Sequence, residues 1–237
     1  MEYIRITKEN LEAEHICCAI AGKKDPQVLA KKEWMKNRLD EGLVFLKGDI
    51  RGKCFIEYIP AEYAWVPINA ENYMHINCFW VSGSCKGNGY ANELLECCIV
   101  SFLSDPQYLA YKGFQIADTA KPYFTLMYLS FDGNAEIPQF KACAKEPNIE
   151  KDGFTLYYTN DCPYTAKYVP VVEQCAVSRG IPFTSVHIDS LKKAQNAPAA
   201  WTNYALFYNG DYITNEILSE KKFITISEKL LDVEPNR

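Results

Sequence analysis

The chain has 237 residues, of which 48% are hydrophobic and 14% aromatic, and its net charge at pH 7 is −5. That length can hold one large domain or two ordinary ones, and the negative charge argues against a nucleic-acid surface as the main function. No apolar run approaches the roughly 18 residues that span a bilayer, and the N-terminus lacks the organisation of a signal peptide, so we expect a cytoplasmic protein without a membrane partner.

The first part of the chain predicts helices followed by antiparallel strands. Pro26 suits the first turn of a helix, where its missing N–H is not needed. The turn from Lys47 to Gly52 joins two strands. In chain order the expected elements are a strand at 3–6, helices at 9–20 and 26–39, strands at 43–46 and 53–59, an irregular loop at 63–72, and a long strand at 73–81.

A glycine-rich loop follows the long strand and leads directly into a helical pattern. Gly83, Gly87 and Gly89 lie between Val81 and Tyr90, where the helical pattern begins. Glycines let the backbone turn sharply and approach a ligand closely. A helix N-terminus presents free N–H groups and the positive end of its dipole. The order of strand, loop and helix therefore predicts an anion cradle.

Two common nucleotide loops do not fit this segment. A Walker A loop requires Lys-Ser/Thr after its last glycine, but Tyr90 and Ala91 follow Gly89. The dinucleotide fingerprint requires a third Gly or Ala where Asn92 stands. Lys86-Gly-Asn-Gly-Tyr-Ala91 instead resembles the pyrophosphate loop of the GNAT acetyltransferases, with Lys where that family usually has Gln or Arg. An ordinary glycine turn before a helix is the alternative.

The GNAT resemblance implies acetyl-CoA as the cofactor. Backbone N–H groups would hold its pyrophosphate, and a free N–H near Val81 would polarise the thioester carbonyl. The implied cofactor-binding residues are Val81, Lys86, Gly87, Asn88, Gly89, Tyr90 and Ala91.

The family order also predicts a strand, parallel to the long one, after the cradle helix. A crossover of this kind takes a dozen or more residues, and too few follow Cys98. We therefore expect about 15–25 residues to be absent between Cys98 and Ser101, either lost from this protein or omitted from the chain. The remaining expected elements are a helix at 107–114, strands at 114–118 and 123–130, and a polar connector at 138–149.

A second unit begins near Gly153. The pattern predicts a strand at 154–159, a helix to about 178, a parallel strand at 182–188, a short helix at 191–197, a hairpin at 204–213 and a closing helix at 221–231. Asn209-Gly210 at the hairpin tip is a strong signal for a type I′ turn. This order resembles the thioredoxin/glutaredoxin fold.

The two units together resemble the YoaP-like acetyltransferases over nearly the whole chain. The segments that carry the resemblance are Trp80-Val-Ser-Gly83, Tyr204-Ala-Leu-Phe-Tyr-Asn-Gly210 and Thr214-Asn-Glu-Ile-Leu-Ser-Glu-Lys-Lys-Phe223. We expect an α/β (α+β) fold, with a GNAT mixed sheet and flanking helices at 1–145 and a small thioredoxin-like domain at 152–237.

Acetyl transfer to an amine also needs a proton acceptor. His75 lies six residues before Val81, where some GNAT enzymes carry a glutamate base. Strand alternation would place His75 on one face with Phe79 and Val81, and an imidazole can accept a proton near neutral pH. Glu57 is a rival base or an amine-binding carboxylate. A strand histidine that is merely hydrogen-bonded is the alternative.

The general acid is harder to assign. The family often has a tyrosine four residues before the Gly of its Gly-Phe stop, but Leu109 stands there. Tyr108 and Tyr111 flank that position, and we favour Tyr111 because it need not fill an apolar slot. The thiolate could also leave unaided, because a thiol pKa near 8.5 makes it a tolerable leaving group.

The ten cysteines do not predict a disulfide framework or a metal site. No Cys-x-x-Cys occurs, and the three histidines are not at zinc spacing. Cys162 alone stands at a strand-to-helix turn, where free N–H groups are expected to lower its pKa. Its partner position is Thr165, so it would act as a one-thiol site or be an inherited scaffold feature.

The sequence therefore predicts an acetyl-CoA-dependent N-acetyltransferase with a small amine or peptide end as acceptor. Glu57 and Glu62, with the aromatic residues at 58–65, would suit such an acceptor. One alternative is a redox or glutathione-linked protein acting through Cys162, and another is a non-catalytic acyl-CoA-binding module.

Overall fold

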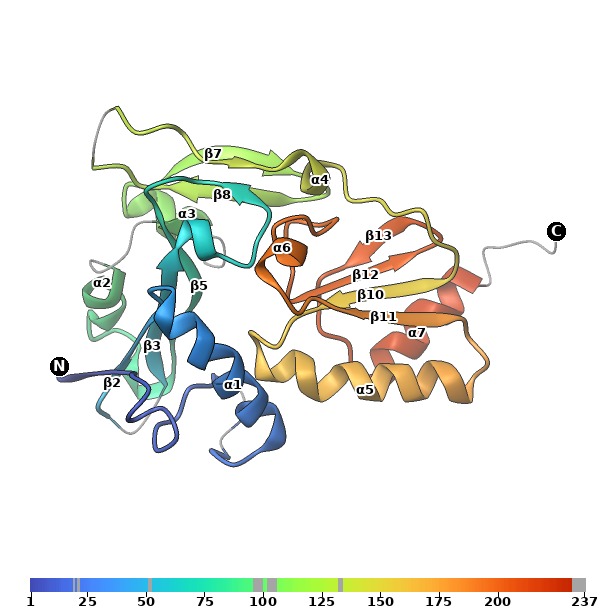
Figure 1. The fold of residues 1–237 in the computed structure, drawn as a ribbon, viewed down its shortest axis with the longest axis horizontal. Helices are drawn as coiled ribbons and strands as arrows, with labels where there is room; N and C mark the ends of the chain where they lie inside the picture. Colours follow the sequence, from blue (N-terminus) through green and yellow to red (C-terminus); the bar gives the residue numbers. More distant parts are fainter. Residues whose placement is uncertain are drawn as a thin grey trace.

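The structure is a computed structural model that describes residues 1–18, 20, 22–50, 53–95, 100–101, 106–131 and 134–231. It has a mixed α/β fold in which a seven-stranded sheet and a four-stranded sheet lie side by side (Figure 1). A separate two-stranded ribbon pairs β4 (Ile68–Asn69) with β9 (Gln139–Phe140). Among the described residues, no helix is long and apolar enough to cross a membrane.

The larger sheet has the strand order β1-β2-β3-β5-β6-β8-β7. Its only parallel pair among the described residues is β5 with β6, and the other neighbours are antiparallel. The strands are β1 (Tyr3–Arg5), β2 (Val44–Gly48), β3 (Cys54–Pro60), β5 (Met74–Val81), β6 (Val100–Ser101), β7 (Gln115–Ala120) and β8 (Phe124–Tyr128).

Helices cover both faces of this sheet because the strand residues alternate. Phe55 of β3 packs into one core cluster with Met35 of α1 (Pro26–Asp40). The next residue, Ile56, packs into another with Leu94 of α2 (Tyr90–Leu95). We call these the α1 face and the α2 face. The remaining helical segments of this part are η1 (Ala61–Tyr63), η2 (Gly83–Cys85), α3 (Pro106–Tyr111) and α4 (Ala142–Lys145).

The smaller sheet has the order β11-β10-β12-β13. As predicted, β10 and β11 are parallel and connected through a helix, and Asn209 and Gly210 at the hairpin tip have φ of +47° and +91°. The elements are β10 (Phe154–Tyr158), α5 (Pro163–Ser178), β11 (Phe183–His187), α6 (Leu191–Ala194), β12 (Tyr204–Tyr208), β13 (Asp211–Thr214) and α7 (Glu220–Leu231).

The two sheets are joined by a shared core. Trp34 and Trp65 meet edge to face with ring centroids 5.8 Å apart, and they belong to one buried cluster with Ile188 and Ala197. The Thr202 hydroxyl donates a hydrogen bond of 2.6 Å to the buried carbonyl of Trp65. Figure 1 shows the resulting contact, with α1 facing the N-terminal end of α5.

The helix predicted at 9–20 is wrong, because this segment forms turns. The Asn10 side chain accepts from the amide of Thr7 (2.8 Å) and donates to the carbonyl of Arg5 (2.9 Å), and such local bonds compete with a helix. Leu11 and Ile16 are nevertheless fully buried. Their apolar spacing reflects core packing without helical backbone.

The parallel strand that we expect to be missing is present in reduced form. β6 has two residues, which pair with His75 and Ile76 of β5 on one side and with β8 on the other. The gap predicted between Cys98 and Ser101 falls largely on residues 96–99, outside the described part of the chain.

Candidate active site

Among the described residues, strand β6 pairs with only the first part of its neighbour β5. The β5–β6 ladder ends at Ile76, whereas β5 continues to Val81 and stays paired with β3 on its other edge. Within the described part of the chain, the β6-side edge of β5 therefore has no partner strand from Asn77 onward. We refer to this edge of β5, from Asn77 to Val81, as the β5 opening.

The amide of Val81 points into this opening. In an antiparallel ladder, successive residues alternate between bonding the partner strand and pointing away from it. The amide of Ser82 donates to the carbonyl of Lys53 at 3.0 Å. The amide of the preceding residue, Val81, must then point away from β3, toward the edge that has no described partner strand.

The glycine loop presents a run of free amides. Gly83, Gly87 and Gly89 all have positive φ, and a Cβ added at any of them would meet no atom within 4 Å. The Lys86 amide is already bonded to the carbonyl of Gly83, which removes one of the six expected donors. Among the described residues, the backbone amides of 87–91 donate no hydrogen bond. The loop therefore has five free donors and open space for an anion.

A pocket of about 200 Å³ lies between the two units on the α1 face. Residues 77–80 of β5 form one wall, and Asp161, Cys162 and Pro163 of the second unit form another. Lys31 reaches in from α1, and Trp201 closes the remaining side. Both units therefore build this pocket, and residues of β5 form part of its wall.

Two buried carboxyl groups and one buried ammonium lie at this pocket. Lys31 Nζ is 2.5 Å from Glu57 Oε2 and 3.9 Å from Asp161 Oδ1. The exposed fractions of Lys31, Glu57 and Asp161 are 3%, 0% and 9%. The two carboxyl groups are within hydrogen-bonding range of each other, and Asn77 Nδ2 donates to Glu57 Oε1 at 3.3 Å. We call Lys31, Glu57 and Asp161 the buried triad.

Burial and neighbouring charges alter the proton affinities in the triad. Burial and the negative charge of Glu57 raise the pKa of Asp161 to about 7, against the opposing effect of Lys31. Burial alone would lower the pKa of Lys31, but the two carboxylates outweigh it and raise that pKa. Lys31 therefore stays charged, while Asp161 can exchange a proton near neutral pH.

Sequence reasoning identified Glu57 but missed Lys31, Asp161 and Asn77. Lys31 lies on the buried stripe of α1 between Val28 and Met35. A lysine on the buried face of a helix needs a buried counter-charge. The position of Lys31 on that face was the sequence signal from which the triad could have been predicted. Asp161 comes from more than 100 residues beyond Glu57 in the sequence, so their proximity depends on the packing of the two units.

His75 is buried, and its position differs from the one expected. A bulge between β3 and β5 inserts Asn77, so His75 pairs with Ile59 of the α1 face, whereas Phe79 pairs with Ile56 of the α2 face. The predicted alternation of His75 with Phe79 and Val81 is therefore wrong. Burial lowers the pKa of His75 to about 4, and its Nδ1 has no hydrogen-bond partner. Such an imidazole is a weak base at neutral pH.

Of the two tyrosines of α3, Tyr108 lies beside the glycine loop, whereas Tyr111, the expected candidate for the general acid, does not. Tyr111 is 83% exposed, and its ring lies against Lys112, so its described contacts do not link it to the pocket. Tyr108 instead donates to Asn92 of α2 at 3.2 Å, beside the glycine loop. Leu109 between them is buried in a core cluster, as an apolar slot requires.

The pKa expected for Cys162 is also wrong. Cys162 is the N-cap residue of α5 and lines the pocket, but burial raises the pKa of its thiol to about 11, and the charge of Lys31 only partly opposes this. All eight cysteines of the described part are free thiols. In that part, no group of His, Cys, Asp or Glu side chains is arranged to hold a metal ion.

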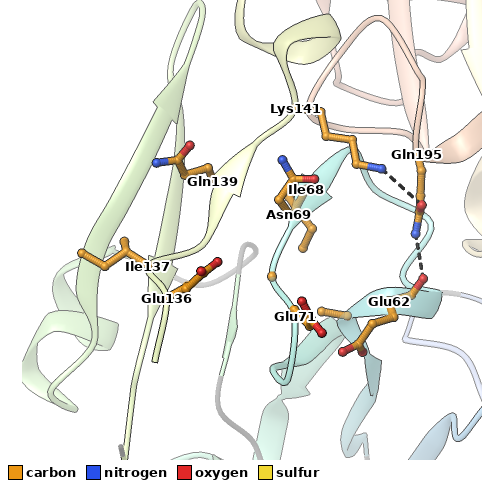
Figure 2. Close-up of a pocket in the computed structure, with 11 residues that line it drawn as sticks. Glu62, Ile68, Asn69, Glu71, Glu136, Ile137, Gln139, Lys141 and Gln195 are labelled. Carbon is orange, nitrogen blue, oxygen red and sulfur yellow. Dashed lines mark hydrogen bonds between the residues drawn. The ribbon is translucent and has the colours of Figure 1, made fainter. Parts of the chain in front are cut away.

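A second cavity, of about 770 Å³, lies at the other end of β5. Figure 2 shows Glu62, Glu71 and Glu136 around it, with Lys141 bonded to Gln195 and Gln195 bonded to the backbone carbonyl of Glu62. Glu62 is thus in a different place from Glu57, although the sequence analysis grouped the two as acceptor-binding carboxylates.

Comparisons with known proteins agree on one family. The YoaP-like family model matches residues 182–224. A Bacillus subtilis (strain 168) protein named "Uncharacterized N-acetyltransferase YoaP" is 42% identical, with 98% of this chain and 99% of the relative covered. The alignment extends over 252 residues, which exceeds the length of this chain. No solved structure matches. The chain belongs to the YoaP-like N-acetyltransferases of the GNAT type.

Proposed function

We propose that this N-acetyltransferase takes its acetyl group from acetyl-CoA and transfers it to a small amine or a free peptide end. The observation that carries the proposal is the set of five free amides at residues 87–91, next to a strand whose edge is open. Backbone donors at a helix start suit a pyrophosphate, and the positive charge of Lys86 adds to them. The space beside Gly87 and Gly89 leaves room for the anion.

The bound acetyl-CoA supplies an activated thioester. The amide of Val81 is aimed to polarise its carbonyl, because that amide faces the β5 opening. Of the two residues that the sequence suggests, Glu57 is better placed than His75 to act on the amine as a charged carboxylate, since Glu57 belongs to the buried triad beside the pocket. Tyr108, which contacts the α2 helix, replaces Tyr111 as the candidate acid.

We also propose a thioredoxin-like identity for the second unit and a division of the chain into 1–145 and 152–237. The order β11-β10-β12-β13, with one parallel pair, supports the first point, and the separate sheets support the second. Free cysteines are in keeping with a cytoplasmic location. The raised thiol pKa of Cys162 favours a scaffold role over a redox one.

A shortened segment between Cys98 and Ser101 remains our proposal for the GNAT crossover. The two-residue length of β6 supports it. The relative also has residues without a counterpart here, because the aligned region is longer than this chain.

The first test is acetyl-CoA binding by isothermal titration calorimetry, together with CoA release in the presence of primary amines. We expect binding by the unchanged protein, and binding at least about tenfold weaker after Gly89→Val, since a side chain would enter the anion space. Gly180→Val is the matched control, because Gly180 also has positive φ and open surroundings but lies at the end of α5.

Two outcomes would contradict the proposal. An unchanged protein that does not bind acetyl-CoA would exclude the cofactor. Binding without acetylation of any amine would leave an acyl-CoA-binding module in place of an enzyme.

A further inference from the structure

We propose that the interdomain pocket is the amine site and that Asp161, supplied by the second unit, accepts the proton of the incoming ammonium. This inference rests on the proposed acetyltransferase function and names its acceptor class: primary amines with a short apolar or aromatic body. The second unit would then complete the active site.

The charges of the buried triad provide the first argument. Glu57 and Asp161 are two acids buried against one ammonium, that of Lys31. An unpaired buried charge is costly, so one carboxyl group must either hold a proton or meet a second cation. Within the described part of the chain, Lys31 and Asp161 are the only charged side chains that line the pocket, so an ammonium entering it would be that second cation.

The shape of the pocket provides the second argument. Apart from Lys31 and Asp161, its walls are mainly apolar, and Phe55, Phe79, Trp80 and Trp201 are the aromatic members. Aromatic faces favour an ammonium nearby and an apolar body beyond it. A volume of about 200 Å³ suits a benzylamine-sized acceptor. An acidic group on the acceptor would instead lie near the carboxyl groups of Glu57 and Asp161 and would be repelled by their negative charge.

A small neighbouring cavity provides an independent indication of a polar occupant. It measures about 10 Å³ and shares Asn77, Asp161, Trp201 and Asn203 with the pocket. His75 lines it, is 3% exposed, and has no hydrogen-bond partner at Nδ1. A buried polar atom of this kind, beside Asp161, lacks the partner that buried polar atoms normally have.

The position of the pocket fits the direction of the chemistry. The pocket is bounded by residues 77–80 of β5, whose outer edge has no partner strand among the described residues. A thioester held by the glycine loop and the Val81 amide would pass through this opening. The amine would meet its carbonyl carbon from the α1 face.

The step balances as follows. The ammonium gives one proton to the Asp161 carboxylate, and the freed nitrogen lone pair forms a C–N bond with the acetyl carbon. The C–S bond breaks, and its electron pair leaves with the CoA sulfur. The second nitrogen proton neutralises that thiolate, and Asp161 returns its proton to solvent. The sum is ammonium plus acetyl-CoA giving amide, CoA thiol and one proton.

The groups that face Asp161 set the pH at which it can act. They are Lys31 from α1, Glu57 from β3, Asn203 before β12, and the neighbouring thiols of Cys162 and Cys18. A carboxyl group whose pKa lies near the working pH is suited to general base catalysis.

The test measures acetylation of benzylamine and 2-phenylethylamine, with glutamate as the acidic comparison amine, across pH 5.5–9. We expect kcat/KM of the unchanged protein to rise through an apparent pKa near 7 and glutamate to be a poor acceptor. Asp161→Asn should lower kcat about 100-fold or more and abolish that rise, while acetyl-CoA binding is retained. Asp161→Glu should restore part of the rate. Asp189→Asn, at an exposed ion pair, should change nothing.

A second variant keeps the test decisive if Asp161→Asn does not fold. Glu57→Gln removes a negative charge that raises the pKa of Asp161, so the apparent pKa of the rate profile should fall by about one unit or more. An unmoved profile in Glu57→Gln, or an unchanged rate in Asp161→Asn, would overturn the inference. Acetylation of glutamate in preference to both aromatic amines would also overturn it, and so would a failure to acetylate either kind of amine. Failure to bind acetyl-CoA would be separate, since it removes the proposed function itself.

Discussion

At the scale of single residues, the same residue type has different chemistry in different surroundings. Glu57 and Glu62 are five positions apart, yet Glu57 is fully buried against Lys31, and Glu62 lines an open cavity and accepts from the amide of Asn72 at 2.8 Å. Only the buried residue has surroundings of low polarity, in which a single neighbouring charge changes proton affinity strongly.

His75 gives a prediction about stability against pH. Burial lowers its folded pKa to about 4, so between pH 6.5 and 4 the unfolded chain takes up a proton that the folded chain does not. Stability is therefore lost as pH falls through this window. His75→Gln should remove about 2 kcal/mol of that loss at pH 4.5 relative to pH 7.5, measured by urea unfolding.

The raised pKa of Asp161 acts in the opposite direction in the same window, but it is common to both proteins and cancels in the comparison. Parallel stability profiles for the unchanged protein and His75→Gln would show that His75 titrates normally.

At the scale of elements, backbone irregularities decide the geometry of the site. The bulge at Asn77 lets residues 77–80 form a pocket wall and places His75 on the opposite face from Phe79. Among the described residues, β6 pairs with β5 only at His75 and Ile76, which leaves the rest of that edge without a described partner. Neither the pocket wall at residues 77–80 nor the uncovered edge of β5 could be predicted from the regular alternation of strand residues.

The β12–β13 hairpin gives a prediction at this scale. Gly210 has φ of +91°, and a Cβ there would lie 2.6 Å from the carbonyl oxygen of Ile149. Gly210→Ala should therefore cost about 2–4 kcal/mol of unfolding free energy, from backbone strain together with the clash. The difference in unfolding free energy between the unchanged protein and Gly210→Ala is measured by urea unfolding.

Gly180→Ala is the matched control for the hairpin. Gly180 has φ of +66° but no atom within 4 Å of an added Cβ, so only strain of about 1 kcal/mol should appear. Equal losses in the two variants would mean that the loop at Ile149 moves aside freely.

At the scale of the whole molecule, the two units are coupled by a common core. Trp34 and Trp65 of the first unit pack with Ile188 and Ala197 of the second, and the Thr202–Trp65 hydrogen bond is buried. Separate domains usually meet through smaller and more polar interfaces. A buried triad that draws on both units adds to this coupling.

We therefore predict one cooperative unfolding transition. Tryptophan fluorescence and far-UV circular dichroism should give coincident curves in urea. Thr202→Val leaves the carbonyl of Trp65 without its donor and should lower the unfolding free energy by about 1–3 kcal/mol while the transition stays single. Two separated transitions in the unchanged protein would contradict this coupling.

Local signals in the sequence were sufficient for most elements. The helix at 26–39, the parallel pair with its connecting helix, and the Asn209-Gly210 hairpin are confirmed, because their signals are proline placement, periodicity and turn chemistry within a few residues. The helix predicted at 9–20 is wrong, because tertiary burial of Leu11 and Ile16 reproduces a helical spacing in a segment that forms only isolated turns.

The sequence by itself determined the family resemblance and the glycine loop, since a pyrophosphate cradle consists of backbone amides and needs only adjacent residues. The tertiary structure alone decided the buried triad and the pocket. Lys31, Glu57 and Asp161 lie far apart in the chain, and no local pattern encodes their contact. Their charges become chemically important only because the packing of the two units removes them from water.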